Sequence, residues 1–356
     1  MVEIRTENLT KRFGKVIALD KVTLKIRHGE LFTLLGPSGC GKTTFLRTIA
    51  GFEMPDEGRI FFDGVDVTDV PAHKRGAGMV FQNYALWPHM SVYDNIAYGL
   101  KLRKLPKEEI DKRVKEALRL VKLEGLEKRN PHQLSGGQQQ RVAVARVLVI
   151  NPRVLLLDEP LSNLDAKLRI EMRGEVKKLQ RRLGITTIYV THDQEEAMSI
   201  SDRIAIMNNG RIEQIGTPME IYFRPKNDFV ADFIGQGTFM RGEVIEIGRW
   251  LKVELENGKI IHAIPSDPTN PPKIGDKVLI TIRPESFKIG RIEGFNVFKC
   301  KIDTVFFLGK FKRLRAESEN YSFLIEVDPT MRVEAGDEIT VSVSPDKTLA
   351  IKSSKS

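Results

Sequence analysis

A glycine-rich stretch ending in a lysine and a threonine has the clearest chemical meaning in this sequence. Gly36–Thr43 reads Gly-Pro-Ser-Gly-Cys-Gly-Lys-Thr and fits the pattern G-x-x-x-x-G-K-[ST], called the P-loop. In that pattern backbone N–H groups surround phosphates, the lysine (Lys42) reaches the outer phosphates, and the hydroxyl (Thr43) ligates Mg²⁺. An apolar segment precedes the stretch and a helical one follows it, as the pattern requires. The sequence therefore predicts a nucleotide-binding site.

Two adjacent carboxylates end a second apolar run. Asp158 and Glu159 follow Val154–Leu157. A carboxylate at the end of a buried strand needs a compensating charge, and Mg²⁺ beside the P-loop supplies one for Asp158. Glu159 is suited to polarise an attacking water as a general base. An ordinary Asp-Glu turn before Pro160 is the plain structural alternative.

A second turn with two glycines lies between these motifs. Ser135 is in a typical N-cap position, and Gly136 and Gly137 precede a helix that we expect over 138–150. Glycines at a helix start permit close approach of phosphates. Because the P-loop already surrounds its own phosphates, this second helix start is predicted to serve the nucleotide of another copy. A flexible turn before a helix is the alternative.

The elements that position these motifs alternate along the chain. Apolar strands are expected at 31–35, 154–157, 186–190 and 203–207, and helices at 42–50, 166–183 and 194–201. This alternation predicts a mostly parallel sheet surrounded by helices. Residues 91–130 show helical spacing, and their apolar face includes Ile110, Val114, Leu118 and Val121.

The texture of the sequence changes after about residue 236. Short alternating strands, separated by Gly, Pro and Asp, are expected at 243–247, 251–255, 277–282, 322–327 and 338–342. This pattern is typical of a small β-barrel. We therefore expect an α/β P-loop domain over 1–235, with a helical subdomain at about 88–150, and an all-β, OB-like domain over 236–356.

Taken in order, the motifs resemble those of the ATP-binding subunits of ABC transporters, and most of all those of the maltose-type importers. Phe13 matches the aromatic residue that stacks on adenine, where the family more often carries tyrosine. The resemblance also implies an ATP-binding segment that runs through the P-loop into the helix after it, and consists of Ser38, Gly39, Cys40, Gly41, Lys42, Thr43 and Thr44.

The same resemblance implies the remaining catalytic residues. Gln82 matches a glutamine that senses Mg²⁺ and water, and is expected at the metal with Thr43 and Asp158. His192 matches the switch histidine that contacts the γ-phosphate. The implied catalytic residues are thus Lys42, Gln82, Glu159 and His192, with Mg²⁺ as the cofactor.

The family's arrangement also assigns partners. In the family, two cassettes dimerise head to tail, so that each ATP contacts the signature and the D-loop of the partner. The signature corresponds to Leu134–Gln138, and its expected contact residues are Ser135, Gly136, Gly137 and Gln138. The D-loop corresponds to Ser162–Asp165, with Asp165 as the expected contact residue. The resemblance implies a homodimer, two integral-membrane permease subunits and, indirectly, an extracellular solute-binding protein. The apolar loop Asn83–Met90 is expected to line a groove for a permease helix; packing inside the helical subdomain is the alternative. Arg283–Glu285 matches a motif of the importers' OB-like regulatory domain.

Composition agrees with a peripheral protein on the cytoplasmic face of the membrane. The 356 residues are 41% hydrophobic, with no apolar run of the roughly 18–20 residues that span a bilayer and no secretory h-region at the start. Two cysteines, Cys40 and Cys300, indicate a reducing compartment, and Cys40 is expected to be a small filler of a tight turn. The net charge of +9 is best explained by solvated lysines, and no nucleic-acid partner is expected.

The leading prediction is an ATPase that powers solute import. The segments Leu134–Arg141 and Ser162–Arg169 favour sugars, while importers of polyamines, glycerol phosphate or inorganic anions use nearly the same cassette. A soluble ABC ATPase that acts on nucleic acid or ribosomes is a rival, although those relatives usually carry a long coiled-coil insertion or two fused cassettes. A P-loop kinase is a third reading, against which the Ser-Gly-Gly turn argues.

Overall fold

The computed structural model describes residues 2–353 and divides into two compact units. The first ends at Pro218 and the second starts at Met219. The sequence-based boundary at 235 would instead give the two short helices α7 (Pro218–Phe223) and α8 (Asp228–Phe233) to the nucleotide-binding part.

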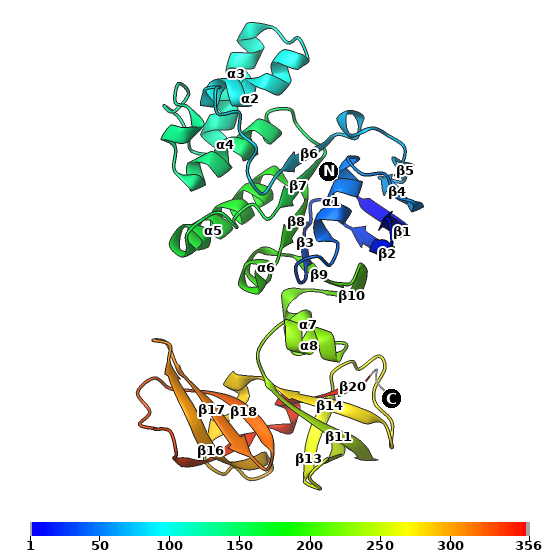
Figure 1. Cartoon of the computed structure of the whole chain (residues 1–356), viewed down its shortest axis with the longest axis vertical. Coiled ribbons are helices and arrows are strands. Elements are labelled where there is room, and N and C mark those ends of the chain that lie inside the picture. The colour runs from blue at the N-terminus through cyan, green and yellow to red at the C-terminus, as the bar shows by residue number, and fades with distance from the viewer. Residues whose placement is uncertain (1, 354–356) are drawn as a thin grey trace. The chain divides into compact units, whose positions relative to one another are not determined.

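A six-stranded sheet forms the centre of the first unit (Figure 1). In spatial order its strands are β10 (Arg211–Gly216), β9 (Arg203–Asn208), β3 (Leu31–Leu35), β8 (Thr186–Thr191), β7 (Val154–Asp158) and β6 (Ala77–Val80). All neighbouring pairs are parallel except β9–β10. Every residue of β3, β7 and β8 is buried, as expected for parallel strands covered on both faces. The residues after β3, β7 and β8 therefore meet at one edge of the sheet.

Helices and a second sheet complete this core. The helices next to the six-stranded sheet are α1 (Lys42–Ala50), α5 (Ala166–Leu183) and α6 (Gln194–Ile200). The second sheet is antiparallel and has the order β2-β1-β4-β5, with β1 (Ile4–Phe13), β2 (Val16–Ile26), β4 (Glu57–Phe62) and β5 (Val65–Asp66). One-turn 3₁₀ helices lie at Ala72–Lys74 and Pro131–Gln133. The predicted α/β P-loop fold is confirmed.

Three helices gather at one end of the first unit, beyond β6 and β7 (Figure 1). They are α2 (Val92–Leu102), α3 (Lys107–Leu120) and α4 (Gly136–Leu148). The apolar face predicted for α3 is confirmed, because Ile110, Val114 and Leu118 are buried in one cluster with residues of α2 and α4. Helix α4 begins two residues earlier than expected, so that both glycines of the signature lie inside its first turn.

The second unit is built mainly from strands. A closed barrel has the order β11-β12-β13-β20-β14, and a five-stranded sheet has the order β15-β19-β16-β17-β18. The barrel strands are β11 (Thr238–Ile247), β12 (Leu251–Leu255), β13 (Ile260–Pro265), β14 (Lys277–Ile282) and β20 (Thr348–Lys352); the sheet strands are β15 (Lys288–Ile289), β16 (Asn296–Phe307), β17 (Lys312–Ser318), β18 (Tyr321–Val327) and β19 (Glu338–Val343). Short 3₁₀ helices occupy Pro284–Ser286 and Pro345–Lys347. The predicted all-β, OB-like domain is confirmed, and the second sheet is an addition to the expected barrel.

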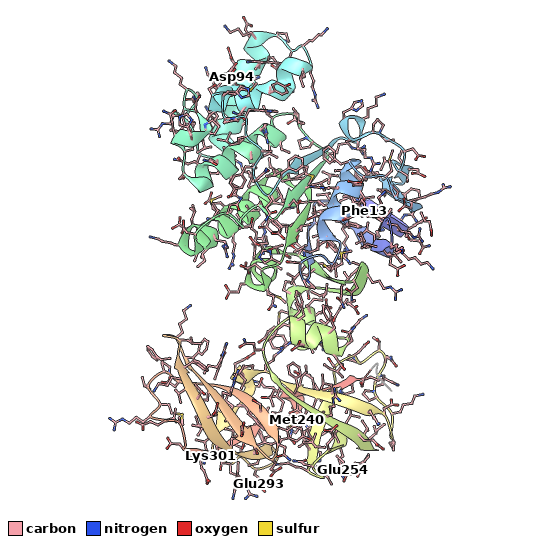
Figure 2. The ribbon with its side chains drawn as sticks, viewed as in Figure 1. Phe13, Asp94, Met240, Glu254, Glu293 and Lys301 are labelled. Carbon is pink, nitrogen blue, oxygen red and sulfur yellow. The ribbon has the colours of Figure 1, made fainter. Side chains whose placement is uncertain are left out.

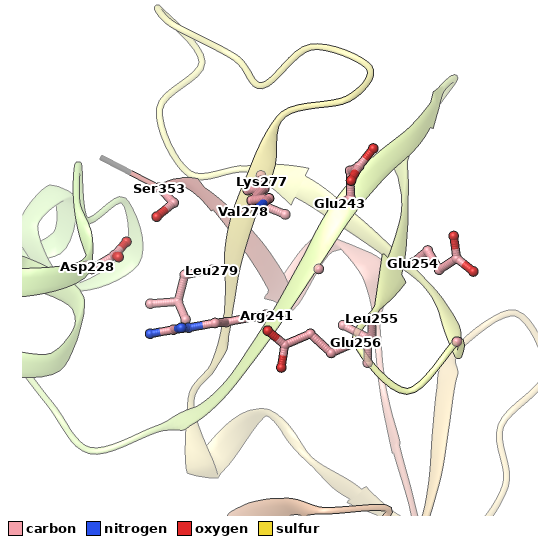
Figure 3. Close-up of a pocket in the computed structure, with 12 residues that line it drawn as sticks. Asp228, Arg241, Glu243, Glu254, Leu255, Glu256, Lys277, Val278, Leu279 and Ser353 are labelled. Carbon is pink, nitrogen blue, oxygen red and sulfur yellow. The ribbon is translucent and has the colours of Figure 1, made fainter. Parts of the chain in front are cut away.

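A cavity of about 550 Å³ lies beside the barrel strands. Figure 3 shows Arg241 and Lys277 among its lining residues together with several carboxylates, including Glu243 and Glu254. No aromatic residue is among the lining residues of the described chain. The cavity therefore lacks the stacking surface that single-stranded nucleic acid requires.

Candidate functional site

Two positions of the P-loop have no room for a side chain. Gly41 has φ +105°, and a Cβ built on it would lie 2.2 Å from the carbonyl oxygen of Ala18. A Cβ on Gly36 would lie 2.2 Å from the carbonyl oxygen of Met207. These close approaches turn the chain directly from β3 into α1, whose first-turn N–H groups then face the loop.

Lys42 is buried within this loop, with 5% of its surface exposed. Its Nζ donates hydrogen bonds to the carbonyl oxygens of Gly36 and Pro37, both at 2.8 Å. Neighbouring Cys40 is also buried, and burial raises the pKa of its thiol. This environment fits the predicted packing role of Cys40, because an inert, protonated thiol is a small apolar filler.

Thr43 and Asp158 meet at the end of β7. The Thr43 hydroxyl donates a hydrogen bond to Oδ1 of Asp158 at 3.0 Å. Burial, together with the neighbouring charge of Glu159, raises the pKa of the Asp158 carboxyl, while the Thr43 hydrogen bond opposes that rise. A hydroxyl and a carboxylate are oxygen ligands suited to Mg²⁺, which one or two carboxylates and the substrate phosphates usually hold. Within residues 2–353 there is no cluster of three or more His, Cys, Asp or Glu with metal-binding geometry.

Glu159 is the meeting point of three segments. Its Oε2 lies 3.1 Å from Nδ1 of His192 and 3.2 Å from Nε2 of Gln82. Glu159 has φ +43°, a conformation uncommon outside glycine, and its backbone N–H bonds to the carbonyl of Val190 on β8. The structure thus brings Gln82, Glu159 and His192 together as predicted. The Gln82 amide nitrogen donates to Glu159, and its expected place at the metal with Thr43 and Asp158 stays a prediction.

A buried network behind His192 was not predicted. Glu196, which is 3% exposed, accepts hydrogen bonds from the hydroxyl of Tyr189 at 2.5 Å and from that of Thr191. Asp193 N–H donates to Thr191 Oγ1 at 3.0 Å, and Glu196 N–H donates to Asp193 Oδ1 at 2.9 Å. Burial raises the pKa of Glu196. These bonds fix the residues on both sides of His192. The His192 side chain itself is 56% exposed and lies beside Glu159.

The D-loop is tied to Gln82 and to the following helix. The side-chain amide of Asn163 donates to the backbone carbonyl of Gln82 at 2.8 Å. Asp165 is the N-cap of α5 and accepts from Leu168 N–H at 3.0 Å. The role of Asn163 was missed, because nothing in its sequence neighbourhood indicates a contact 81 residues away.

The signature turn is a capped helix start. Ser135 is the N-cap of α4, as predicted, and forms a capping box with Gln138: Ser135 Oγ accepts from Gln138 N–H at 3.3 Å, and Gln138 Oε1 accepts from Ser135 N–H at 3.0 Å. A Cβ on Gly137 would lie 3.1 Å from the Leu168 side chain, and one on Gly136 would lie 3.0 Å from a carbon of Leu164. Close packing against the D-loop for Gly136, and against α5 for Gly137, is therefore a second reason for the two glycines.

The outer members of the predicted ATP site are accessible. Phe13 is 48% exposed at the end of β1, with the Lys11 ammonium 5.4 Å from its ring centre, and Figure 2 labels it on the side of the β1–β2 hairpin. Ser38 and Gly39 are exposed, and Thr44 is partly buried. An exposed aromatic face here leaves Phe13 able to stack on a flat base.

The loop after Gln82 is partly packed into the helical subdomain. Tyr84 is 4% exposed, and Trp87 lies against Tyr98 with ring centres 4.5 Å apart. Ala85, Pro88 and His89 remain exposed. Packing inside the helical subdomain is thus confirmed for Tyr84 and Trp87, while the groove for a permease helix stays a prediction.

Comparison with known proteins gives the family. Residues 19–162 match the family described as ABC transporter, and residues 280–351 match the TOBE domain. The spermidine/putrescine import ATP-binding protein PotA of Rubrobacter xylanophilus is 50% identical over 309 residues, which cover 86% of this chain and 81% of that protein. The chain belongs to the ATP-binding subunits of ABC importers. It is therefore an ATPase that is coupled to import.

Further relatives agree with this assignment. The Fe(3+) ions import ATP-binding protein FbpC of Fusobacterium nucleatum is 45% identical over 354 residues, which cover 97% of this chain and 92% of that protein. A Clostridium perfringens protein described as part of the ABC transporter complex cbiONQ superposes with a TM-score of 0.58 at 35% identity, covering 61% of this chain and 89% of that one. A dimeric ATP-binding cassette in a post-hydrolysis state with ADP and Pi gives 0.54 at 34% identity, covering 60% and 98%.

The names of the PotA and FbpC relatives bear on the expected solute. They refer to polyamines and to iron, so sugar import finds no support in them.

No helix in the described part of the chain, residues 2–353, is long and apolar enough to cross a membrane.

Proposed function

We propose that this chain hydrolyses ATP to drive polyamine uptake through two permease subunits. The observation that carries the proposal is the 50% identity to a spermidine/putrescine import ATP-binding protein. Import of Fe³⁺ is the second candidate, because the iron-import relative matches over 97% of this chain. Polyamines were already an alternative at the level of the sequence.

ATP binding is assigned to the P-loop and to Phe13. The N–H groups of residues 38–44 surround the phosphates, and Phe13 stacks on adenine. Lys42 is held 2.8 Å from two loop carbonyls, so its ammonium already lies inside the loop. It exchanges these neutral acceptors for phosphate oxygens, which bind a cation more strongly.

Thr43 and Asp158 would hold Mg²⁺, with Gln82 as the third residue. The ion supplies charge neutralisation at the β- and γ-phosphates when bound. Because the Thr43 hydroxyl already bonds to Asp158, the two ligands are held together before nucleotide arrives.

Hydrolysis is assigned to Glu159. Its Oε2 accepts the proton of the attacking water. The Gln82 amide donates a hydrogen bond to that oxygen, and Nδ1 of His192 lies 3.1 Å from it. His192 keeps its other ring nitrogen for the γ-phosphate. Such positioning is the main contribution that a protein makes to phosphoryl transfer.

The partner copy completes each site. Ser135, Gly136, Gly137 and Gln138 present the start of α4 to the ATP of the other subunit, and Asp165 lies in the D-loop beside it. The resulting head-to-tail homodimer is peripheral, at the cytoplasmic face of the membrane. The exposed part of the Asn83–Met90 loop contacts the permeases, the solute-binding protein acts only through them, and nucleic acid is not a partner.

Reconstitution tests the transported solute. The chain is assembled in vesicles with the permeases encoded beside it, and ATPase activity is measured after adding the binding protein loaded with spermidine, Fe³⁺ or maltose. Stimulation by the spermidine-loaded protein is expected. If only the Fe³⁺-loaded protein stimulates ATPase activity, Fe³⁺ import replaces polyamine import as the function. If only the maltose-loaded protein does so, the sugar prediction is restored.

A further inference from the structure

Two residues after Gln82 the backbone enters an uncommon conformation. Tyr84 and Ala85 have φ +60° and +45°. Left-handed backbone is disfavoured for residues with a Cβ, and two in succession persist only where the surroundings hold them. The segment Gln82–Met90, the Q-loop segment below, therefore depends on contacts from elsewhere for its shape.

Arg146 of α4 provides those contacts. Its Nη1 donates to the carbonyl oxygen of Ala85 at 2.6 Å, and its Nη2 donates to that of Tyr84 at 2.8 Å. The guanidinium also lies 4.8 Å from the ring centre of Trp87. Burial lowers the pKa of the Arg146 guanidinium. The planar fork of arginine can bond both carbonyls at once, which an ammonium cannot do with the same geometry.

The far end of the same segment is tied to α2. Asn95, which is fully buried, accepts a hydrogen bond from Trp87 N–H at 2.9 Å and donates to the carbonyls of Trp87 and Met90 at 3.1 and 3.2 Å. The Q-loop segment is thus fixed to two helices, and Arg146 is its connection to the helix that carries the signature.

Arg146 and the signature lie on one continuous helix. Gly136 begins α4 and Arg146 lies in its last turn, a separation of about 15 Å at ~1.5 Å per residue. Gln82 at the other side bonds to Glu159. A short, direct chain of contacts therefore joins the base of one site to the helix start that serves the partner's site.

We propose that Arg146 is a positioning residue that fixes the Q-loop segment to α4, so that Gln82 stays on Glu159 and the signature keeps a set position relative to it. The inference rests on the proposed roles of Gln82 and Ser135. Arg146 touches neither nucleotide nor water in this account, and acts through the carbonyls of residues 84 and 85.

Replacement of Arg146 by methionine tests the proposal in the full-length chain. Because the P-loop is untouched, ATP affinity should stay unchanged, while kcat should fall by about 10- to 100-fold, the cost of a misplaced catalytic group. Arg146→Lys should give an intermediate kcat. Arg103→Met is the matched control: Arg103 also donates to a carbonyl, that of Ile150 at 3.1 Å, but away from the Q-loop segment, and its loss should leave kcat unchanged.

A double-mutant cycle separates positioning from a general loss of structure. If Arg146 acts through Gln82, the Arg146→Met change should cost little in kcat once Gln82→Ala is present. Additive losses in the cycle, or a normal kcat for Arg146→Met with normal ATP affinity, would overturn the inference. If Arg146→Met does not fold, the cycle is run with Arg146→Lys, under the same expectation. Normal turnover of Glu159→Gln would instead show that the proposed hydrolysis chemistry is at fault.

Discussion

The catalytic edge and the signature turn both present a helix start and small residues, yet they differ in how complete they are. At the catalytic edge Lys42, Thr43, Asp158 and Glu159 are held by bonds to other parts of the same unit. At the signature turn Ser135 and Gln138 bond to each other, and the two glycines pack on Leu164 of the D-loop and Leu168 of α5. The residues of the first region are thus held by bonds between separate segments of one chain, whereas the second region is a self-contained helix start, for which we propose a role in the site of a second copy.

Within the catalytic edge, loss of the general base Glu159 should have the largest effect on ATP turnover. Glu159→Gln keeps the shape of the side chain but cannot accept a proton, so turnover should fall by about 10²- to 10⁴-fold. ATP should still bind, and the closed dimer should accumulate, which size-exclusion chromatography with ATP measures. Hydrolysis at the normal rate would show that another group is the base.

Loss of the P-loop cation should weaken binding itself. Lys42→Ala removes charge-assisted bonds worth about 1.5–3 kcal/mol, so ATP affinity should drop by roughly 10- to 100-fold. Isothermal titration measures this in the isolated chain. Unchanged affinity would mean that the phosphates lie elsewhere and that the catalytic edge is not the ATP site.

The buried carboxyl behind His192 should give a smaller, pH-dependent effect. Burial raises the pKa of Glu196 in the folded state, so its contribution to stability is complete below the unfolded pKa and is lost as pH rises through the folded pKa. The Glu196→Gln variant has no such charge. Its stability relative to the parent chain should therefore increase with pH across that window, by up to about 1.4 kcal/mol for each unit between the two pKa values.

Denaturant unfolding of both chains at pH 4 to 8 measures this difference. A difference that does not change with pH would show that Glu196 ionises as freely as in the unfolded chain. Tyr189→Phe, which removes one hydrogen bond to Glu196, is the matched control. Because that bond lowers the pKa of Glu196, this variant should keep the full pH dependence or show a larger one.

Much of the fold and site could be predicted because local patterns encode them. The helix Lys42–Ala50 and the strand Leu31–Leu35 have the predicted bounds, since an apolar run, a glycine turn and a helical repeat determine them together. Ser135 was predicted as an N-cap from its residue type and its place before an expected helix, and it is the N-cap of α4. Gln82 and His192 were named from the family resemblance. The structure shows why they approach Glu159, because Gln82, His192 and Glu159 follow β6, β8 and β7, whose ends share one edge.

The remaining features depend on contacts between distant residues. Arg146 bonds to backbone carbonyls 61 and 62 residues away, and carbonyls leave no mark in the sequence. The sequence around Glu196 is typical of a solvent-exposed helix, and only the fold brings the hydroxyls of Tyr189 and Thr191 to its carboxylate. The solute could not be predicted because the motifs serve ATP, and importers of different solutes use the same ones.

Ser135→Arg tests the central claim most directly, because it changes the signature turn without touching the catalytic edge of the same chain. ATP affinity and turnover are measured on one preparation. The account predicts normal ATP affinity and abolished hydrolysis, since the bulky cation blocks the partner's phosphates and not its own. Two results would contradict the claim that each site is completed by another copy: the loss of both ATP affinity and hydrolysis, or hydrolysis at the normal rate.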